Sequence, residues 1–123
     1  MSRVCLAAVG DVMLGDDGLL IGSGVRSRIE RFGPAFPFEH TAALLHSANV
    51  AFCNLECVLS DAAVKPDCIR SLALRGSPRS VEGLSGAGFR VASLANNHCL
   101  DHGEIALRET AAALSAAGIA VVG

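Results

Sequence analysis

Four polar side chains crowd into one short segment of the sequence: Asn96, Asn97, His98 and Asp101. An apolar run, residues 89–94, comes before this segment, and a strongly helical run, residues 104–117, follows it. In an open α/β sheet, ligands bind at such junctions, where a strand ends and the chain turns toward a helix. Amide, imidazole and carboxylate groups in this position could bind a metal ion, donate a proton or cap the helix.

Polar residues follow two earlier apolar runs in the same way. Asp11 comes shortly after residues 3–9, and Asn54 and Glu56 stand at the end of residues 50–55. The carboxyl ends of parallel strands share one edge of a sheet, so we expect the three polar groups to converge there. Two carboxylates, an amide oxygen and an imidazole suit a hard or borderline divalent cation. Carboxylates that bridge two metal ions are common in phosphatases.

Each residue of this group also has a purely structural explanation. Asp11 could be a turn residue, the two adjacent asparagines could be turn formers, and His98 could be a satisfied core histidine. Glu56 is harder to explain in this way, because an unpaired buried carboxylate is costly. Asp101 and Glu104 fit a capping box, so we expect Asp101 to act first as a helix cap. We expect the remaining histidines to be surface residues: His40, His46 and His102.

The elements that must position these groups alternate between strand and helix. Apolar runs predict buried strands at residues 3–9, 50–55, 89–94 and 119–122. Helical spacing predicts helices at residues 38–48, 78–84 and 104–117, with Ser77 as the N-cap of the second. We expect a loop or short helical pieces at residues 15–33, and an edge strand or hairpin arm at residues 69–74. The order predicts an α/β fold built mostly of parallel βαβ units.

Composition limits the function further. The chain has 123 residues, of which 51% are hydrophobic and 18% charged, so we expect one folded domain rather than a disordered segment. A net charge of −2 without a basic stripe argues against nucleic-acid binding, and no G-x-G-x-x-G motif supports a dinucleotide site. No signal peptide or membrane-spanning run is recognisable, which favours a cytoplasmic location. Without a C-x-x-C pair, the five cysteines are expected to be reduced core thiols rather than zinc ligands.

Three ordered motifs stand out: residues 10–15 (Gly-Asp-Val-Met-Leu-Gly), residues 54–56 (Asn-Leu-Glu), and residues 93–98 (Ser-Leu-Ala-Asn-Asn-His) with Asp101 and Gly103. Together they resemble the bacterial capsule synthesis protein CapA family, the poly-γ-glutamate capsule family. This family is a branch of the calcineurin-like metallophosphoesterases. The resemblance implies the N-terminal half of their sandwich fold, with residues 1–123 forming an incomplete domain. In the complete domain of the family, later strands would carry further histidine ligands.

The resemblance also implies roles for individual residues. Asp11 would bind one metal ion, Glu56 would bridge two, Asn97 would bind the second, and His98 would act as general acid or electrostatic stabiliser. Asn54 and Asn96 are weaker candidates for substrate binding. The implied cofactor is a dinuclear centre of Mn²⁺, Fe or Zn²⁺, and the implied reaction is hydrolysis of a polymer or phosphoester.

The sequence therefore leaves two hypotheses for the whole chain. In the first, the chain is part of a metal-dependent hydrolase associated with the cell envelope. In the second, it is a non-catalytic α/β module that acts in envelope polymer assembly or is completed by a partner chain. An exposed sheet edge would favour association in either case.

Overall fold

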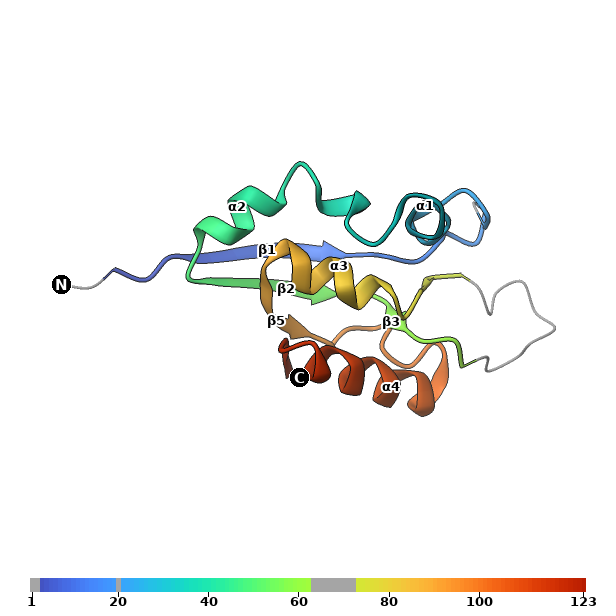
Figure 1. Ribbon diagram of the computed structural model, residues 1–123. Coiled ribbons are helices and arrows are strands. Elements are labelled where there is room, and N and C mark those ends of the chain that lie inside the picture. The colour runs from blue at the N-terminus through green and yellow to red at the C-terminus, as the bar shows by residue number, and fades with distance from the viewer. Residues whose placement is uncertain (1–2, 20, 63–72) are drawn as a thin grey trace.

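A four-stranded parallel sheet organises the molecule (Figure 1), in the computed structural model that describes residues 3–19, 21–62 and 73–123. Its strands, in spatial order, are β1 (Leu6–Val12), β2 (Val50–Leu55), β5 (Phe89–Ser93) and β6 (Ala120–Val122). A second, two-stranded parallel sheet pairs β3 (Val58–Leu59) with β4 (Arg75–Gly76). The α/β class with parallel βαβ units is confirmed, and it is consistent with a partial metallophosphoesterase-like fold.

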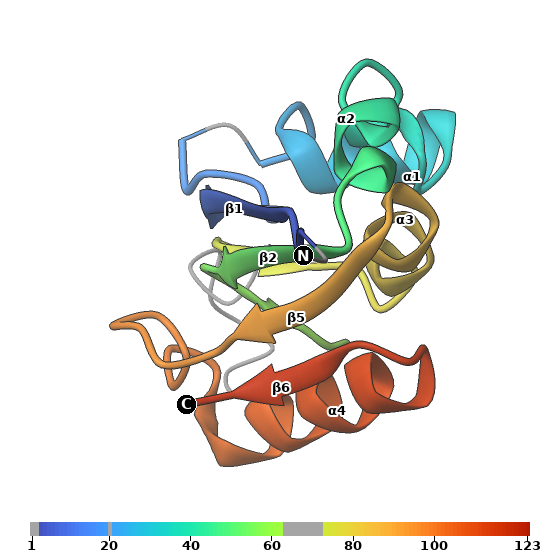
Figure 2. The same cartoon turned by 90° about the vertical axis from the view of Figure 1, so that its left-hand side faces the viewer.

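Along the sequence, the helices lie between successive strands of the large sheet. They are α1 (Val25–Phe32), the short 3₁₀ helix η1 (Phe36–Phe38), α2 (Ala42–Ser47), α3 (Ser80–Ala87) and α4 (Gly103–Ala116). Helix α2 contacts β2, α3 contacts β5, and α4 contacts β6 (Figure 2). The strand order never reverses, and parallel crossovers are almost always right-handed, so the helices are expected on the same face of the sheet. No helix of the described ranges is long and apolar enough to cross a membrane.

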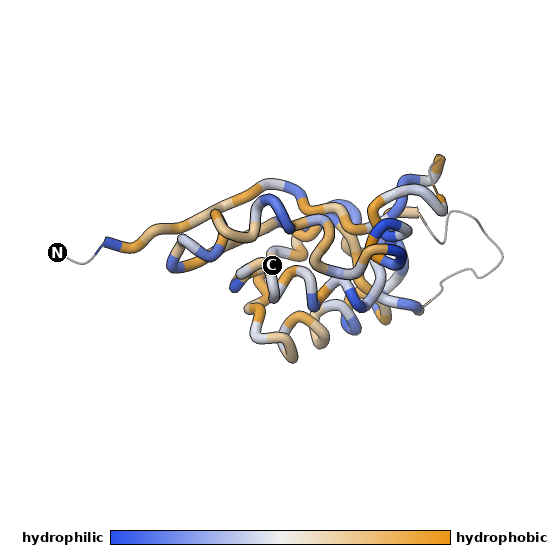
Figure 3. The backbone as a smooth tube through the Cα atoms, turned by 45° about the horizontal axis from the view of Figure 1, so that its top comes forward, coloured by the Kyte–Doolittle hydropathy of each residue, from blue (hydrophilic) through white to orange (hydrophobic). Residues whose placement is uncertain are grey.

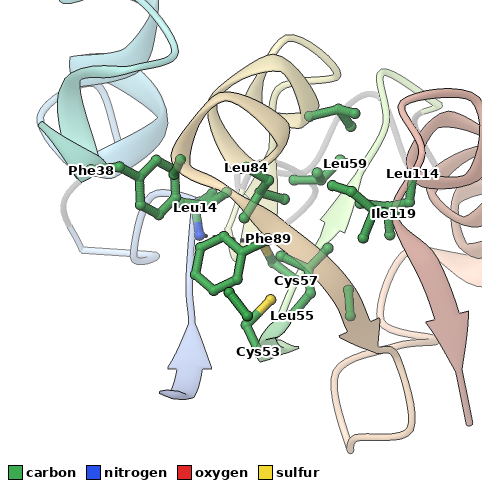
Figure 4. Packing of buried hydrophobic residues seen from close by; sticks show 14 of the residues in the cluster. Leu14, Phe38, Cys53, Leu55, Cys57, Leu59, Leu84, Phe89, Leu114 and Ile119 are labelled. Carbon is green, nitrogen blue, oxygen red and sulfur yellow. Dashed lines mark hydrogen bonds between the residues drawn. The ribbon is translucent and has the colours of Figure 1, made fainter. Parts of the chain in front are cut away.

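The core lies between the helices and the face of the sheet that they cover. Ala51, Cys53 and Leu55 alternate along β2 as its buried positions, as expected for a strand with one covered face. The side chains labelled in Figure 4 all belong to this cluster: Leu14, Phe38, Cys53, Leu55, Cys57, Leu59, Leu84, Phe89, Leu114 and Ile119. Phe38 meets Phe89 edge to face, with ring centroids 5.8 Å apart.

The opposite face of the large sheet is apolar but open. The strand register places seven apolar side chains there, all exposed or half-buried: Leu6, Ala8, Val50, Phe52, Val91, Ala120 and Val122. In Figure 3 the segment that contains β1 is largely in the hydrophobic colours. Association through this region or through the sheet edge stays a prediction.

The first strand differs most from the sequence-based expectation. It runs over Leu6–Val12 rather than residues 3–9, and most of it is exposed rather than buried on both faces. The reason is its position, because among the described strands β1 pairs with β2 alone and therefore forms one edge of a sheet with one open face. A continuous apolar run identifies a strand, but it does not say whether both faces are covered.

Other boundaries shifted by smaller amounts. The helix expected at residues 38–48 is divided into η1 and α2, and α3 begins at Ser80, after Arg79 rather than Ser77 as N-cap. Gly86 lies inside α3, and the helix ends only at Gly88, whose left-handed φ of 101° provides the usual glycine stop. Most of the edge strand expected at residues 69–74 lies outside the described residues.

Candidate functional site

A β-bulge in β1 brings Asp11 to the candidate site. Ala8 pairs with Phe52, but the next paired residues are Asp11 and Asn54, so β1 carries one extra residue between the two pairs. A regular ladder would place Gly10 opposite Asn54 and turn Asp11 toward the helices. The bulge instead puts Asp11 and Asn54 side by side on the open face. Asp11 thus lies within the strand, not after its end as the sequence suggested.

Asn54 connects the two carboxylates of the site. Its Nδ2 atom donates to Asp11 Oδ1 at 2.7 Å and also donates to Glu56 Oε2. An amide nitrogen carries two hydrogens, so one is available for each carboxylate. Asn54 therefore offsets part of the repulsion between Asp11 and Glu56 and holds them together at the carboxyl edge of the sheet. The predicted convergence of these strand ends is present.

Asn96 extends this network to the third strand end. Its Nδ2 atom donates to Asn54 Oδ1 at 3.1 Å and to the Leu55 carbonyl oxygen at 2.8 Å. Its Oδ1 atom accepts the backbone N–H of His98 at 3.0 Å. Asn96 thereby links the end of β2 to the turn after β5. Substrate binding by Asn54 and Asn96 stays a prediction, and the contacts show both amides directed into the network.

His98 stands between two carboxylates. Its Nδ1 atom lies 2.7 Å from Asp101 Oδ2, and its Nε2 atom lies 3.9 Å from Glu56 Oε1. An ionised carboxylate only accepts hydrogen bonds, so Nδ1 carries a hydrogen and donates it to Asp101. This bond fixes the imidazole ring and directs Nε2 toward Glu56. The side chains of Glu56 and His98 are 15% and 29% exposed, so both remain accessible from solvent.

The expected helix cap at Asp101 is wrong. Helix α4 begins at Gly103 after His102, and no side chain of the described residues bonds to its N-terminus as a cap. Asp101 lies one residue too early and uses its carboxylate to hold His98 instead. Glu104, its supposed capping-box partner, pairs with Arg108 on the surface of α4. The spacing of three residues between His98 and Asp101 was the sequence signal for this pair, but the capping pattern competed with it.

Asn97 is the least constrained of the predicted metal ligands. It is exposed, and its side chain forms no hydrogen bond with any other residue of the described ranges. Its neighbours Asn96 and His98 are both held by the network, so the backbone fixes where Asn97 lies. Its role as a ligand stays a prediction.

The donor chemistry of the network suits a divalent cation only in part. Carboxylate oxygens, an amide and an imidazole are suitable ligands for Mn²⁺, Fe²⁺ or Zn²⁺. Within residues 3–19, 21–62 and 73–123, however, no cluster of three or more His, Cys, Asp or Glu side chains has the geometry to hold a metal ion. The described residues therefore supply a paired carboxylate and an oriented imidazole, not a complete coordination shell.

Two cysteines lie beneath this network as core residues. Burial raises the pKa of Cys53 to about 12. Burial also raises the pKa of Cys57 to about 11, although backbone N–H groups of Leu14, Gly15 and Gly76 partly oppose the shift. A thiol with so high a pKa stays protonated at neutral pH and is a poor metal ligand. The expectation of free core thiols is confirmed for both cysteines.

A cavity of about 480 Å³ adjoins the site on the side of Asp101. Gly18, Ala73, Leu74, Asp101 and His102 line it. The expectation of a surface position for His102 is wrong: this residue is 4% exposed, and its Nε2 atom lies 2.9 Å from the Ala73 carbonyl oxygen. Local sequence gave no sign of this, because Ala73 comes from a distant segment.

The sequence of this chain is similar to bacterial capsule synthesis proteins. The family model described as "Bacterial capsule synthesis protein PGA_cap" matches residues 5–123. The "Capsule biosynthesis protein CapA" of Bacillus anthracis is 27% identical over 123 residues, an alignment that covers 98% of this chain and 28% of that protein. The chain therefore spans little more than a quarter of the length of this curated relative.

Proposed function

The chain belongs to the bacterial capsule synthesis protein family, and from this membership we propose that its carboxylate–amide–imidazole network is part of a divalent-metal hydrolase site. The substrate would be a capsule polymer or a phosphoester, and the protein would work at the cell envelope. The Bacillus anthracis relative is named a capsule biosynthesis protein, which supports the first substrate class.

One observation carries the proposal: Asp11, Glu56 and His98 lie at one edge of the sheet, on or just after three neighbouring strands, and hydrogen bonds through Asn54 and Asn96 connect them. Two carboxylates held side by side repel each other and create a negative potential between them. A cation near these oxygens would be favoured by both charges. Core packing does not require such an arrangement, because Asp11 is exposed on the open face of the sheet.

In the proposed reaction the residues of this chain have distinct tasks. Asp11 and Glu56 would hold the cation, with Asn97 as a further ligand. The cation would polarise the bond under attack and offset the negative charge that develops there. His98 faces the same space through Nε2, while Asp101 holds its Nδ1–H. His98 is thereby placed to donate a proton to a leaving group or to stabilise its charge.

Cation binding is the direct test of this proposal. We would titrate the chain with Mn²⁺ in a calorimeter, together with Glu56→Gln and the control Glu82→Gln, which removes the same charge from an exposed position on α3. The proposal predicts that Glu56→Gln binds Mn²⁺ at least about tenfold more weakly than the wild type. Glu82→Gln should bind like the wild type. Equal binding by all three proteins would refute the role of Glu56.

The alternative, a non-catalytic module of envelope polymer assembly, is favoured by the incomplete donor set of the described residues. This reading predicts that Mn²⁺ neither binds nor raises the melting temperature of the wild-type chain. Size-exclusion chromatography would then ask whether the chain associates with itself. A monomer that is indifferent to the metal would exclude both the metal site and self-association.

A further inference from the structure

We propose that Asn54 is a positioning residue that selects which oxygen of each site carboxylate can face a cation, and that Asn96 locks its orientation. This inference rests on the proposed function, since it concerns the same carboxylates. It gives Asn54 and Asn96 a task other than substrate binding. The proposal follows from a chain of hydrogen bonds that begins at the backbone.

Two backbone groups fix the amide of Asn96. The Leu55 carbonyl oxygen can only accept, so the atom 2.8 Å from it must be Nδ2 of Asn96. The His98 N–H can only donate, so the atom 3.0 Å from it must be Oδ1 of Asn96. Rotating this amide by about 180° would break both hydrogen bonds, because it would place the amide oxygen against the Leu55 carbonyl oxygen and the amide NH₂ against the His98 N–H. The orientation of Asn96 is therefore determined without reference to the carboxylates.

The orientation of Asn54 follows from that of Asn96. The second hydrogen on Asn96 Nδ2 points at Asn54, so the atom 3.1 Å away must be the acceptor Oδ1. Asn54 Nδ2 must then point the other way, toward Asp11 Oδ1 and Glu56 Oε2. Both hydrogens of each amide nitrogen are donated, and each amide oxygen accepts one hydrogen bond, which leaves only the second lone pair of each oxygen unused. Asn54 is thus held as a hydrogen-bond donor toward the carboxylates. It cannot present its oxygen to a cation without disrupting the relay, the series of hydrogen bonds from Asn96 through Asn54 to Asp11 and Glu56.

The consequence concerns the remaining carboxylate oxygens. Asp11 Oδ1 and Glu56 Oε2 each accept a hydrogen bond from Asn54, which leaves Asp11 Oδ2 and Glu56 Oε1 for a cation. Glu56 Oε1 is also the oxygen nearest His98 Nε2, at 3.9 Å. The relay therefore directs the available oxygen of Glu56 into the space that His98 faces. Outer hydrogen bonds of this kind commonly orient metal-binding carboxylates.

The relay itself can be measured by NMR without any cation. The side-chain amide hydrogens of Asn54 should exchange with water about tenfold more slowly than those of the exposed Asn97. Asn96→Leu should remove this protection, although Asn96 does not touch the carboxylates. Asn49→Leu is the matched control, since Asn49 Oδ1 accepts the Cys5 N–H at 2.7 Å near the other end of the same strand pair. If the Asn54 side-chain amide hydrogens exchange as slowly in Asn96→Leu as in the wild type, Asn96 does not fix the orientation of Asn54.

Cation affinity then tests what the relay does. Mn²⁺ titration should show about tenfold weaker binding for both Asn54→Leu and Asn96→Leu, with Asn49→Leu unchanged. The double variant should match Asn54→Leu within about twofold, because both substitutions break one relay. Asn54→Ser, a smaller change, replaces Asn54→Leu if the latter fails to fold. Additive losses, or full affinity in Asn96→Leu, would overturn the proposal.

A missing metal site and a missing Asn96–Asn54 lock would give different results. If the wild-type chain binds no Mn²⁺, the proposed metal site is refuted, and the exchange measurement still decides whether Asn96 locks Asn54. If the wild type binds Mn²⁺ and Asn54→Leu binds it more tightly, Asn54 competes with the cation rather than positioning its ligands. If Asn54→Leu weakens binding while Asn96→Leu does not, Asn54 acts directly and without the lock.

Discussion

Replacing Asp16 should destabilise the fold more than replacing its neighbour Asp17. Asp16 is 3% exposed, and its carboxylate accepts the Ser27 N–H at 3.1 Å, the Ser27 hydroxyl at 2.5 Å and the Gly22 N–H at 3.0 Å. These bonds tie the segment after β1 to the first turn of α1. The approach is so close that a Cβ on Gly24 would lie 2.6 Å from Asp16 Oδ1.

The magnitude follows from the bonds that Asp16→Ala removes. A hydrogen bond to a charged group contributes about 1.5–3 kcal/mol, and a helix N-terminal acceptor contributes about 1 kcal/mol. Gly22 is exposed, so water can replace its bond at little cost. We therefore expect Asp16→Ala to lower the free energy of unfolding by about 3 kcal/mol, roughly 10 °C in melting temperature for a domain of this size. Asp17→Ala, at an exposed position, should cost less than about 0.5 kcal/mol.

The stabilisation by Asp16 should also depend on pH in a defined direction. Burial pushes the pKa of Asp16 up, but the hydrogen bonds from Ser27, Gly22 and Arg26 outweigh it and hold the pKa below its ordinary value of 3.8. The folded state then binds this proton less readily than the unfolded state. The contribution of Asp16 is therefore complete above about pH 3.8 and is lost as the pH falls through the depressed folded-state pKa.

Urea denaturation of wild type, Asp16→Ala and Asp17→Ala provides the measurement, at pH 7 and at steps from pH 5 downward. The difference between wild type and Asp16→Ala should stay constant to about pH 4 and shrink below it. The reasoning would be refuted if Asp16→Ala and Asp17→Ala cost the same at pH 7. A wild-type advantage that persists unchanged in acid would refute the electrostatic part alone.

Further substitutions test interactions of the helices α3 and α4 by urea denaturation. Thr110→Val should cost about 2 kcal/mol, because it leaves the buried Leu59 N–H, now 2.8 Å from Thr110 Oγ1, without a partner; Thr110→Ser, which keeps the hydroxyl, should retain that bond. Gly83→Ala should cost at least about 1–3 kcal/mol, since the new methyl group would lie 2.0 Å from the Pro34 carbonyl oxygen; a neutral result would show that α3 can shift. Arg108→Ala should change stability by less than about 0.5 kcal/mol, because its ion pair on α4 is exposed to solvent.

The sequence was sufficient for the parts of the fold that local pattern controls. Residues 50–55 form a strand with the expected bounds because a short apolar run between polar segments has few alternatives. The meeting of Asp11, Glu56 and His98 also followed from sequence, since parallel strands deliver their ends to one edge. In both cases a one-dimensional pattern and one general rule of topology were enough.

The remaining features depended on partners that are distant in the chain or in competition with each other. Asp101 fitted a cap by spacing, and only the structure shows that His98 takes its carboxylate. His102 is buried because Ala73 lies against it, a contact between segments 29 residues apart. The exposure of β1 depends on what covers the sheet rather than on the strand itself. Such outcomes are properties of packing, which a local pattern does not contain.

The bulge in β1 has a consequence for how this sequence can vary. Along a regular strand, side chains alternate between the two faces, so Ala7 faces the helices and Ala8 faces the open side. The extra residue of the bulge shifts this alternation by one, so Asp11 shares a face with Ala8 and not with Ala7. Removing one residue, such as Gly10, would keep every polar group of the network yet turn Asp11 into the apolar layer. The spacing between Ala8 and Asp11 is thus as much a part of the site as the residues themselves, and comparisons that tolerate gaps there would align chains whose sites differ.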